Sequence, residues 1–155
     1  MKALIVLAFA ALAGAVHAAD APAKDPELKI ATIDGKEFDL AAQKGHWVIV
    51  NYWATWCSPC IKELPEISKF VQEHKNVRAI GLAYEDTDKA EIVAFLKAHP
   101  VVFPIAQVDT FDPPKAFETP RGLPTTYIID PAGKIAQKFT GPVDEAALRK
   151  AIPEK

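Results

Sequence analysis

The chain has 155 residues, of which 18 are basic and 20 acidic, and its formal net charge at pH 7 is −2. The chain lacks the excess of basic residues that would indicate a nucleic-acid partner. It also lacks the run of like charges that would indicate a membrane-surface patch. Thirteen prolines against seven glycines predict stiff turns rather than flexible linkers.

Residues 1–18 have the features of a secretory signal peptide. An early lysine precedes an uncharged apolar run that ends at Val16, and an A-x-A-like site ends at Ala18. The run is shorter than the roughly 18 residues that a membrane-spanning helix needs, so we expect cleavage rather than a retained membrane anchor. We therefore expect a periplasmic protein with a flexible leader at 19–27 and one domain at 28–155, which is long enough for a hydrophobic core.

The first half of the domain has clear strand and helix patterns. Apolar and polar residues alternate on either side of the Asp-Gly pair at 34–35, which predicts a β-hairpin within 28–40. The apolar run at 45–54 is rich in β-branched and aromatic residues and predicts a buried central strand. Apolar residues at spacings of three and four predict a helix over 58–74.

The second half continues this alternation and then closes with a hairpin. A strand at 76–85 precedes an amphipathic helix that begins with a capping box of Asp88 and Glu91 and ends at Pro100. The remaining elements are a strand at 102–108, a loop at 109–122 with a helical turn at 115–117, strands at 125–130 and 134–141, and a helix at 145–152 capped by Asp144. Strands that alternate with helices imply an α/β protein with a partly parallel sheet covered on both faces, and the closing hairpin makes that sheet mixed.

Cys57 and Cys60 are the only cysteines of the chain. Outside the cytoplasm paired thiols meet oxidants, yet a disulfide that closes so short a loop adds little stability. Ser58 and Pro59 occupy the first turn of the predicted helix, so Cys57 faces free backbone N–H groups and the positive end of the helix dipole. Such a setting stabilises a thiolate. We expect Cys57 to attack a substrate disulfide and the more shielded Cys60 to resolve the mixed disulfide.

The cysteine pair has alternative uses that the residues favour less. A structural zinc site needs about four ligands, and the chain has no second cysteine pair to complete one, so we expect no metal. An inert structural disulfide would normally close a longer loop. Peroxidatic cysteines lie in a segment that resembles P-x-x-x-T-x-x-C. Here Thr55 precedes Cys57 at a different offset. Paired thiolates also suit copper(I), but no nearby Met or His completes such a site.

The segments VNYWATWCSPCIKELPEI (50–67) and RGLPTTYIID (121–130) resemble the thioredoxin superfamily. The resemblance is closest to the exported TlpA/ResA-like thiol–disulfide oxidoreductases and covers nearly all of the chain after the leader. It implies an α/β thioredoxin fold: a mixed central β-sheet flanked by helices, with an N-terminal β-hairpin and an inserted β–α segment at about 77–108. It also implies a redox-active Cys57–Cys60 disulfide that works without a cofactor.

The resemblance implies roles for residues near the cysteines. Pro124 matches the cis-proline of the family, which leaves the Leu123 backbone able to pair with an extended substrate segment. The dipeptide Ser58-Pro59, between the cysteines, controls the redox potential. The expected substrate-binding residues are Trp56, Leu123, Pro124 and Thr125.

Glu63 matches an acidic residue that many of these proteins carry three positions after the second cysteine. Helical spacing puts it on the side of Cys60, where a buried carboxyl is able to accept or donate the Cys60 proton. The alternative is a solvated carboxylate paired with a lysine on the helix surface. Thioredoxins proper usually have Asp at the position of Asn51, and Asn cannot carry a proton, which adds weight to Glu63. Asn51 itself is interpreted as a hydrogen-bonded core amide.

The resemblance also favours a direction of electron flow. The TlpA/ResA-like group consists mostly of reductants that are fed electrons across the membrane, so we expect protein disulfides as substrates and a membrane-embedded electron donor. One branch reduces the haem-attachment cysteines of apocytochrome c and carries a G-A-P-E-T-like stretch at the cis-proline. The corresponding stretch here is RGLPTT. A dedicated cytochrome c maturation reductase is therefore the alternative, together with a non-enzymatic copper-handling module.

Overall fold

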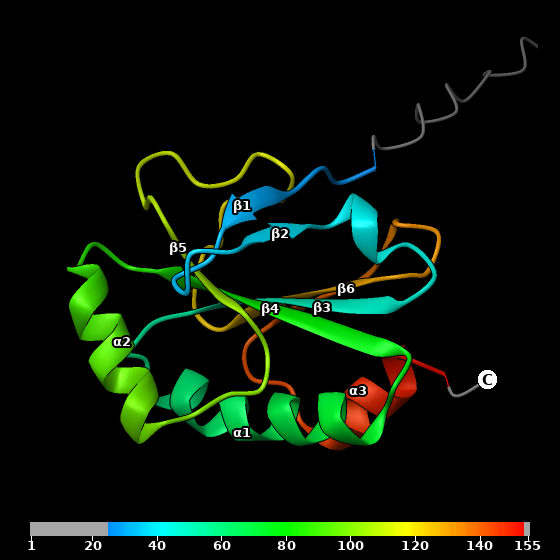
Figure 1. Cartoon of the computed structure of the whole chain (residues 1–155). Coiled ribbons are helices and arrows are strands. Elements are labelled where there is room, and N and C mark those ends of the chain that lie inside the picture. Colours follow the sequence, from blue (N-terminus) through cyan, green and yellow to red (C-terminus); the bar gives the residue numbers. More distant parts are fainter. Residues whose placement is uncertain (1–24, 154–155) are drawn as a thin grey trace, which may run out of the picture.

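The computed structural model describes residues 25–153, so the expected signal peptide and most of the expected leader lie outside the described residues. Five strands form the central sheet in the order β5-β4-β3-β6-β7, and β1 and β2 pair separately as an antiparallel hairpin (Figure 1). The elements are β1 (Lys29–Ala31), β2 (Glu37–Asp39), η1 (Ala41–Gln43), β3 (Trp47–Trp53), α1 (Ser58–Glu73), β4 (Val77–Tyr84), α2 (Lys89–Ala98), β5 (Ile105–Val108), β6 (Thr125–Ile129), β7 (Ile135–Thr140) and α3 (Glu145–Ala151).

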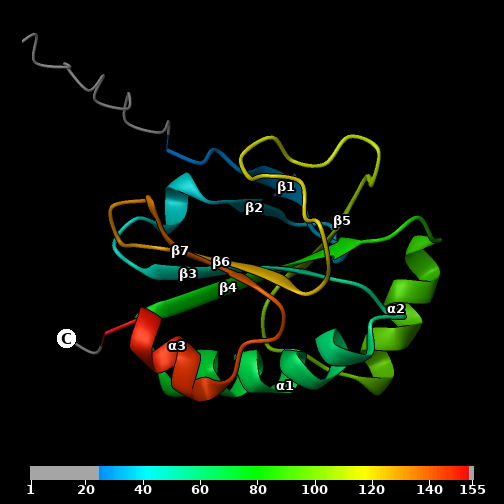
Figure 2. The same cartoon turned by 180° about the vertical axis from the view of Figure 1, so that it is seen from behind.

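The sheet is covered on both faces, as the sequence predicts, but by different structures. The helices α1 and α3 lie side by side on one face with α2 beyond the end of α1, and the hairpin lies on the other face (Figure 1). The view from behind shows the same layers (Figure 2). Phe38 and Leu40 from the hairpin region are buried in one cluster with Val50 of β3. The hairpin therefore occupies the face that the helices leave open, since that face is apolar as well.

The central strand β3 positions the functional site. Its side chains alternate between the two faces: Ile49 and Trp53 belong to the helix-side cluster, and Val50 and Tyr52 to the hairpin-side cluster. β3 pairs in parallel with β4 and antiparallel with β6, which makes the sheet mixed. The chain leaves the middle of the sheet at the end of β3 and enters the cysteine segment directly.

Trp53 packs on the backbone of β4, because residue 81 is a glycine. A Cβ atom at Gly81 would lie 2.5 Å from Ile105 Cδ1 and 3.0 Å from Trp53 Nε1. Trp53 is fully buried, and its ring centroid lies 5.6 Å from that of Phe95 in α2. The last residue of β3 is thus fixed by the core immediately before the cysteine segment begins.

Several predicted boundaries change in the structure. β5 is shorter than the predicted 102–108, since Pro104 has no N–H for a ladder, although its carbonyl accepts from the Gly81 N–H at 3.0 Å. The short helix η1 is not among the predicted elements; it follows a turn in which Asp39 Oδ1 accepts from the Ala41 N–H at 2.8 Å. These differences lie outside the segment that carries the cysteines.

The two predicted helix caps have opposite outcomes. Asp144 caps α3 by accepting from the Ala147 N–H at 2.8 Å, which confirms the prediction. Asp88 is the N-cap residue of α2, as predicted, but its side chain makes no capping hydrogen bond within the described residues, so the predicted capping box does not form. The Glu91 carboxylate instead accepts from the hydroxyl of Thr87, a side chain one residue earlier that competes for it.

Candidate active site

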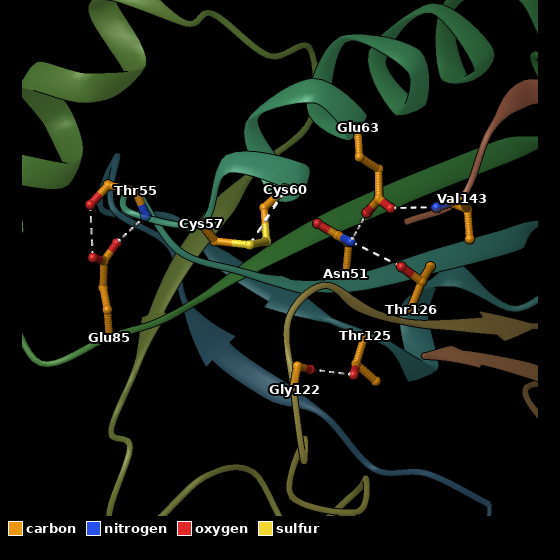
Figure 3. Close-up of a disulfide and its surroundings, with 10 residues drawn as sticks. All are labelled: Asn51, Thr55, Cys57, Cys60, Glu63, Glu85, Gly122, Thr125, Thr126 and Val143. Atoms are coloured by element: carbon orange, nitrogen blue, oxygen red, sulfur yellow. Dashed lines mark hydrogen bonds between the residues drawn. A yellow bond between two sulfur atoms is a disulfide. The ribbon is translucent and has the colours of Figure 1, made fainter. Parts of the chain in front are cut away.

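Cys57 and Cys60 form a disulfide at the N-terminus of α1 (Figure 3). Cys57 is the N-cap residue, and Ser58 and Pro59 form the exposed first turn, as predicted. Proline is tolerated there because the helix has no acceptor for its missing N–H. The Cys60 N–H donates to Cys57 Sγ at 3.4 Å. The first sulfur thus lies against the free amides of the helix start, which favours a thiolate once the disulfide is reduced.

The surroundings of the two sulfurs differ in exposure. Cys57 is 4% exposed and Cys60 is 1% exposed, so the expected order of shielding is confirmed by a narrow margin. Trp56, the residue before the disulfide, is 70% exposed. It presents a large apolar surface next to Cys57, while Trp53 lies in the core, as predicted.

The Leu123–Pro124 peptide bond is cis, as the resemblance implies. Leu123 packs against the cluster that contains both cysteines, and Tyr52 of β3 is paired with Thr125, so the proline turn lies beside the segment that follows β3. The Thr125 side chain is buried, and its hydroxyl donates to the Gly122 carbonyl at 2.8 Å. Thr125 therefore holds the turn from inside, and its part in substrate binding stays a prediction.

Glu63 lies one turn after Cys60 and is 2% exposed. This burial is incompatible with a solvated carboxylate on the helix surface. The Glu63 oxygens accept from Asn51 Nδ2 at 2.5 Å and from the Val143 N–H at 2.6 Å (Figure 3). Desolvation by burial raises the pKa of Glu63 to about 7, although hydrogen bonds from Val143, Asn51 and Thr126 oppose the rise. A carboxyl with this pKa exchanges protons near neutral pH.

Asn51 connects β3 to Glu63 and to β6. Besides its bond to Glu63, Asn51 Nδ2 donates to Thr126 Oγ1 at 2.9 Å. Asn51 Oδ1, in contrast, is buried with no hydrogen-bond partner among the described residues. The prediction of a hydrogen-bonded core amide is therefore correct for the nitrogen and wrong for the oxygen. The pairing of Asn51 with Thr126 in the β3–β6 register brings these two side chains together.

Glu85 is a second buried carboxylate near the cysteines, and it is not among the predicted site residues. It follows the last residue of β4, is 6% exposed, and accepts from both the backbone N–H (2.9 Å) and the hydroxyl (2.8 Å) of Thr55. Figure 3 shows the two bonds at the start of the cysteine segment. An acidic residue directly after an apolar strand was the available signal, since parallel strands bring such positions to one edge of the sheet.

Within residues 25–153, no group of three or more His, Cys, Asp or Glu side chains has the arrangement of a metal site. In the same residues, no helix is both long enough and apolar enough to cross a membrane. The chemistry that the described arrangement offers is sulfur exchange at the disulfide, with proton exchange at Glu63.

Comparison with known proteins agrees with this chemistry. The model of a family described as the AhpC/TSA family matches residues 19–138. The thiol-disulfide oxidoreductase ResA of Bacillus thuringiensis subsp. konkukian (strain 97-27) is 33% identical over 129 residues, which cover 82% of this chain and 73% of that protein. ResA of Bacillus subtilis (strain 168) is 29% identical over 125 residues, with coverages of 79% and 69%.

Solved structures give the same result. A thiol:disulfide interchange protein of the thioredoxin family from Chlorobium tepidum TLS is similar with a TM-score of 0.71 at 26% identity, over 81% of this chain and 90% of that chain. StoA from Bacillus subtilis is similar with a TM-score of 0.69 at 25% identity, over 84% and 98% of the two chains.

The fold and the site together define the class of the protein. The protein has the features of a thioredoxin-fold protein-disulfide oxidoreductase. These are a mixed sheet, an N-terminal hairpin, a disulfide at the start of α1 and a cis-proline beside it. The chain belongs to the AhpC/TSA family, and its curated relatives are thiol–disulfide oxidoreductases of the ResA type. The thioredoxin fold predicted from the resemblance is thus confirmed, and residues 77–108 form β4, α2 and β5.

Proposed function

We propose that this protein reduces disulfides of other proteins outside the cytoplasm, by exchange with the thiols of Cys57 and Cys60. The observation that carries the proposal is the position of Cys57 Sγ against the Cys60 amide, with the buried Glu63 carboxyl one turn behind. The signal-peptide features of residues 1–18 support a periplasmic location. The similarity to ResA proteins supports thiol chemistry.

The first step is attack by the Cys57 thiolate on one sulfur of a substrate disulfide. A bond forms between Cys57 and that sulfur as the substrate disulfide breaks, and the second substrate sulfur leaves as a thiolate that takes up a proton. The conformation of Ser58-Pro59 holds Cys57 at the helix start and so influences the redox potential. The exposed Trp56 and the turn at Leu123–Pro124 provide the surface for the substrate segment, with Thr125 as the buried support of that turn.

The second step releases the substrate. The Cys60 thiol gives its proton to Glu63, and its sulfur attacks Cys57 Sγ. The mixed disulfide breaks, the substrate sulfur leaves as a thiolate and is protonated, and the Cys57–Cys60 disulfide forms. The substrate has then gained two electrons from the two cysteine sulfurs and two protons from solvent. Solvent has received the Cys57 proton on ionisation of the thiol and receives the Cys60 proton when Glu63 releases it. A dithiol donor, which we propose to be membrane-embedded, returns the protein to its reduced form, with no further cofactor.

Glu63 suits the second step because burial raises its pKa to about 7. A carboxylate with the ordinary pKa near 4.5 would be a much weaker base toward a thiol. Near neutral pH, Glu63 is present in both forms, so it accepts a proton in one half of the cycle and returns it in the other.

Reduction of insulin disulfides tests the enzymatic proposal. We expect the wild-type protein to reduce insulin with a thiol donor present, and Cys57→Ser to have no activity above the donor alone. Equal activity of Cys57→Ser would contradict the proposal. Stoichiometric copper(I) binding without any turnover would favour the copper-handling module instead.

Trapping in the host bacterium identifies the substrate. A Cys60→Ser variant performs the first step only, so it is expected to accumulate mixed disulfides that mass spectrometry identifies. Adducts with apocytochrome c alone would make the protein a dedicated cytochrome c maturation reductase, and adducts with several unrelated proteins would make it a broader reductase. No adducts, or the same adducts with Cys57→Ser, would contradict the order of attack.

A further inference from the structure

The side-chain amide of Asn51 is hydrogen-bonded on one side only. Asn51 is 1% exposed, and its nitrogen donates to Glu63 and to Thr126. Its oxygen has no hydrogen-bond partner within residues 25–153. A half-turn of the amide exchanges the nitrogen and the oxygen. Because Oδ1 makes no hydrogen bond within the described residues, a half-turn of the amide breaks no hydrogen bond of this atom. The orientation is therefore determined by Glu63 and Thr126.

Thr126 is able to pair with either orientation. A hydroxyl both accepts and donates, so Thr126 Oγ1 is able to accept from Asn51 Nδ2 or to donate to Oδ1 after a half-turn. Glu63 is different, because its charge decides whether it needs a hydrogen-bond donor or an acceptor opposite it. An ionised carboxylate only accepts, whereas a protonated carboxyl needs an acceptor for its proton. The protonation state of Glu63 thus decides which atom of Asn51 faces it.

The fold also decides which oxygen of Glu63 carries the proton. Oε2 accepts from the Val143 backbone N–H, which is a donor at every pH. The proton therefore binds to Oε1, the oxygen that faces Asn51. A protonated Oε1 opposite Asn51 Nδ2 would set two donors against each other in a buried site, which is costly.

We propose that Asn51 is a positioning residue whose amide turns over when Glu63 takes up a proton. Nδ2 donates to Oε1 of the carboxylate, and Oδ1 accepts from Oε1–H of the acid, while Thr126 reverses its hydrogen bond. Both oxygens of Glu63 stay hydrogen-bonded in either state. The inference rests on the proposed function of Glu63, because such a partner lets Glu63 bind and release a proton while both of its oxygens keep a hydrogen bond.

The groups that face Glu63 come from four parts of the fold. Three of them hydrogen-bond to Glu63: Asn51 on β3, Thr126 on β6 and the Val143 N–H before α3. The fourth, Cys60, lies one turn earlier on α1. Cys60 is titratable, but in the disulfide form it carries no proton. A titration of the disulfide form thus isolates the exchange between Glu63 and Asn51.

Neutron crystallography of the perdeuterated protein in its disulfide form, at pH 5 and at pH 9, tests the proposal. At pH 9 we expect two deuterons on the Asn51 atom that faces Glu63, and none on Glu63. At pH 5 we expect one deuteron on Glu63 Oε1 and a bare Asn51 oxygen facing it. An amide with the same orientation at both pH values, with Glu63 protonated at pH 5, would overturn the proposal, as would a Glu63 that stays ionised at pH 5.

Two variants serve as matched controls. In Glu63→Gln the Val143 N–H holds the new amide oxygen, so the new NH2 group faces residue 51. Asn51 Oδ1 is then expected to face residue 63 at both pH values. In Thr126→Val the pH-dependent turn is expected to persist, because Asn51 and Glu63 still face each other. Nδ2 of Asn51 facing residue 63 in the Gln variant, or loss of the turn in the Val variant, would contradict the argument.

The outcomes separate this inference from the proposed function. The neutron measurement involves no turnover, so it reports on Asn51 and Glu63 alone. A turning amide together with full insulin reduction by Glu63→Gln would support the inference and contradict the proposed role of Glu63 in catalysis. A fixed amide together with strongly reduced turnover of Glu63→Gln would do the reverse.

Discussion

Two buried carboxylates lie near the disulfide, and the fold holds them in different ways. Glu63, at 2% exposed, takes its hydrogen bonds from two separate parts of the core, the Asn51 amide and the Val143 backbone. Glu85, at 6% exposed, takes both of its bonds from a single residue, Thr55, in the segment that leads to the cysteines. Similar burial therefore accompanies two different kinds of contact.

The difference indicates separate tasks. The partners of Glu63 belong to two strands and to the segment before α3, and they hold it one turn after Cys60, where its raised pKa makes it useful as a proton carrier. The partner of Glu85 is Thr55, two residues before Cys57, so Glu85 is a tether that holds the segment leading to the disulfide. Burial of an acidic residue near a redox site thus does not by itself assign a role in proton transfer.

The largest expected effect is on turnover in Glu63→Gln. This variant keeps the shape of the side chain but removes the proton carrier, and general acid–base groups typically contribute about 100-fold or more. Release of substrate from the mixed disulfide is expected to slow by roughly that factor at pH 8. In the wild type this rate should rise as pH increases through about 7, where Glu63 ionises.

The measurement is the single-turnover release of a fluorescent thiol from a preformed mixed disulfide between pH 5 and 9. The rise near neutral pH should be missing in Glu63→Gln. The matched control is Glu85→Gln, which should keep both the rate and the rise. Equal rates for wild type and Glu63→Gln across this range would remove Glu63 from the mechanism.

The next effect is on stability. Because the pKa of Glu63 rises from 4.5 to about 7 on folding, the folded state binds more protons, so stability is highest below pH 4.5 and falls as pH rises through about 7. A rise of this size corresponds to about 3 kcal/mol. Glu63→Gln should lack this loss, so its free energy of unfolding relative to wild type should increase by about 3 kcal/mol from pH 4.5 to pH 8. Urea denaturation at both pH values measures it, and an unchanged difference would show that Glu63 is not desolvated.

A smaller effect on stability is expected when the contact between Glu85 and Thr55 is removed. Glu85→Ala leaves the Thr55 N–H and hydroxyl without their acceptor, which should lower the free energy of unfolding by about 1–3 kcal/mol. The second-order rate of attack on a substrate disulfide should fall as well, with no change in its pH profile. A new pH dependence in this variant would mean that the two carboxylates share the proton role.

The smallest effect is expected for Thr55→Val. This change removes the hydroxyl bond to Glu85 but keeps the backbone bond, so it should cost about 1 kcal/mol. Thermal and urea denaturation provide the measurement. A loss of stability as large as that of Glu85→Ala would mean that the hydroxyl bond of Thr55, and not its backbone bond, provides all of the stabilisation by Glu85.

The sequence reveals the parts of this site that depend on local spacing. The position of Cys57 at the helix start follows from the helical pattern, and the side of the helix on which Glu63 lies follows from its spacing to Cys60. The cis bond before Pro124 was expected from family resemblance, since no local pattern requires it. Asp144 likewise caps its own helix.

The parts that were missed depend on strand register. Trp53 is paired with Ala83 in the parallel β3–β4 register, so Thr55 and Glu85 each lie two residues beyond a matched pair. Hydrophobic periodicity locates both strands but does not align them. The same limit applies to Asn51, whose partner Thr126 is set by the β3–β6 register.

The most direct test of the account is a titration of the Glu63 carboxyl carbon by 13C NMR in the disulfide form, assigned by its loss in Glu63→Gln. The account predicts a transition near pH 7, where burial places the pKa of this carboxyl. A transition near pH 4.5, the ordinary value for a glutamate, would contradict it.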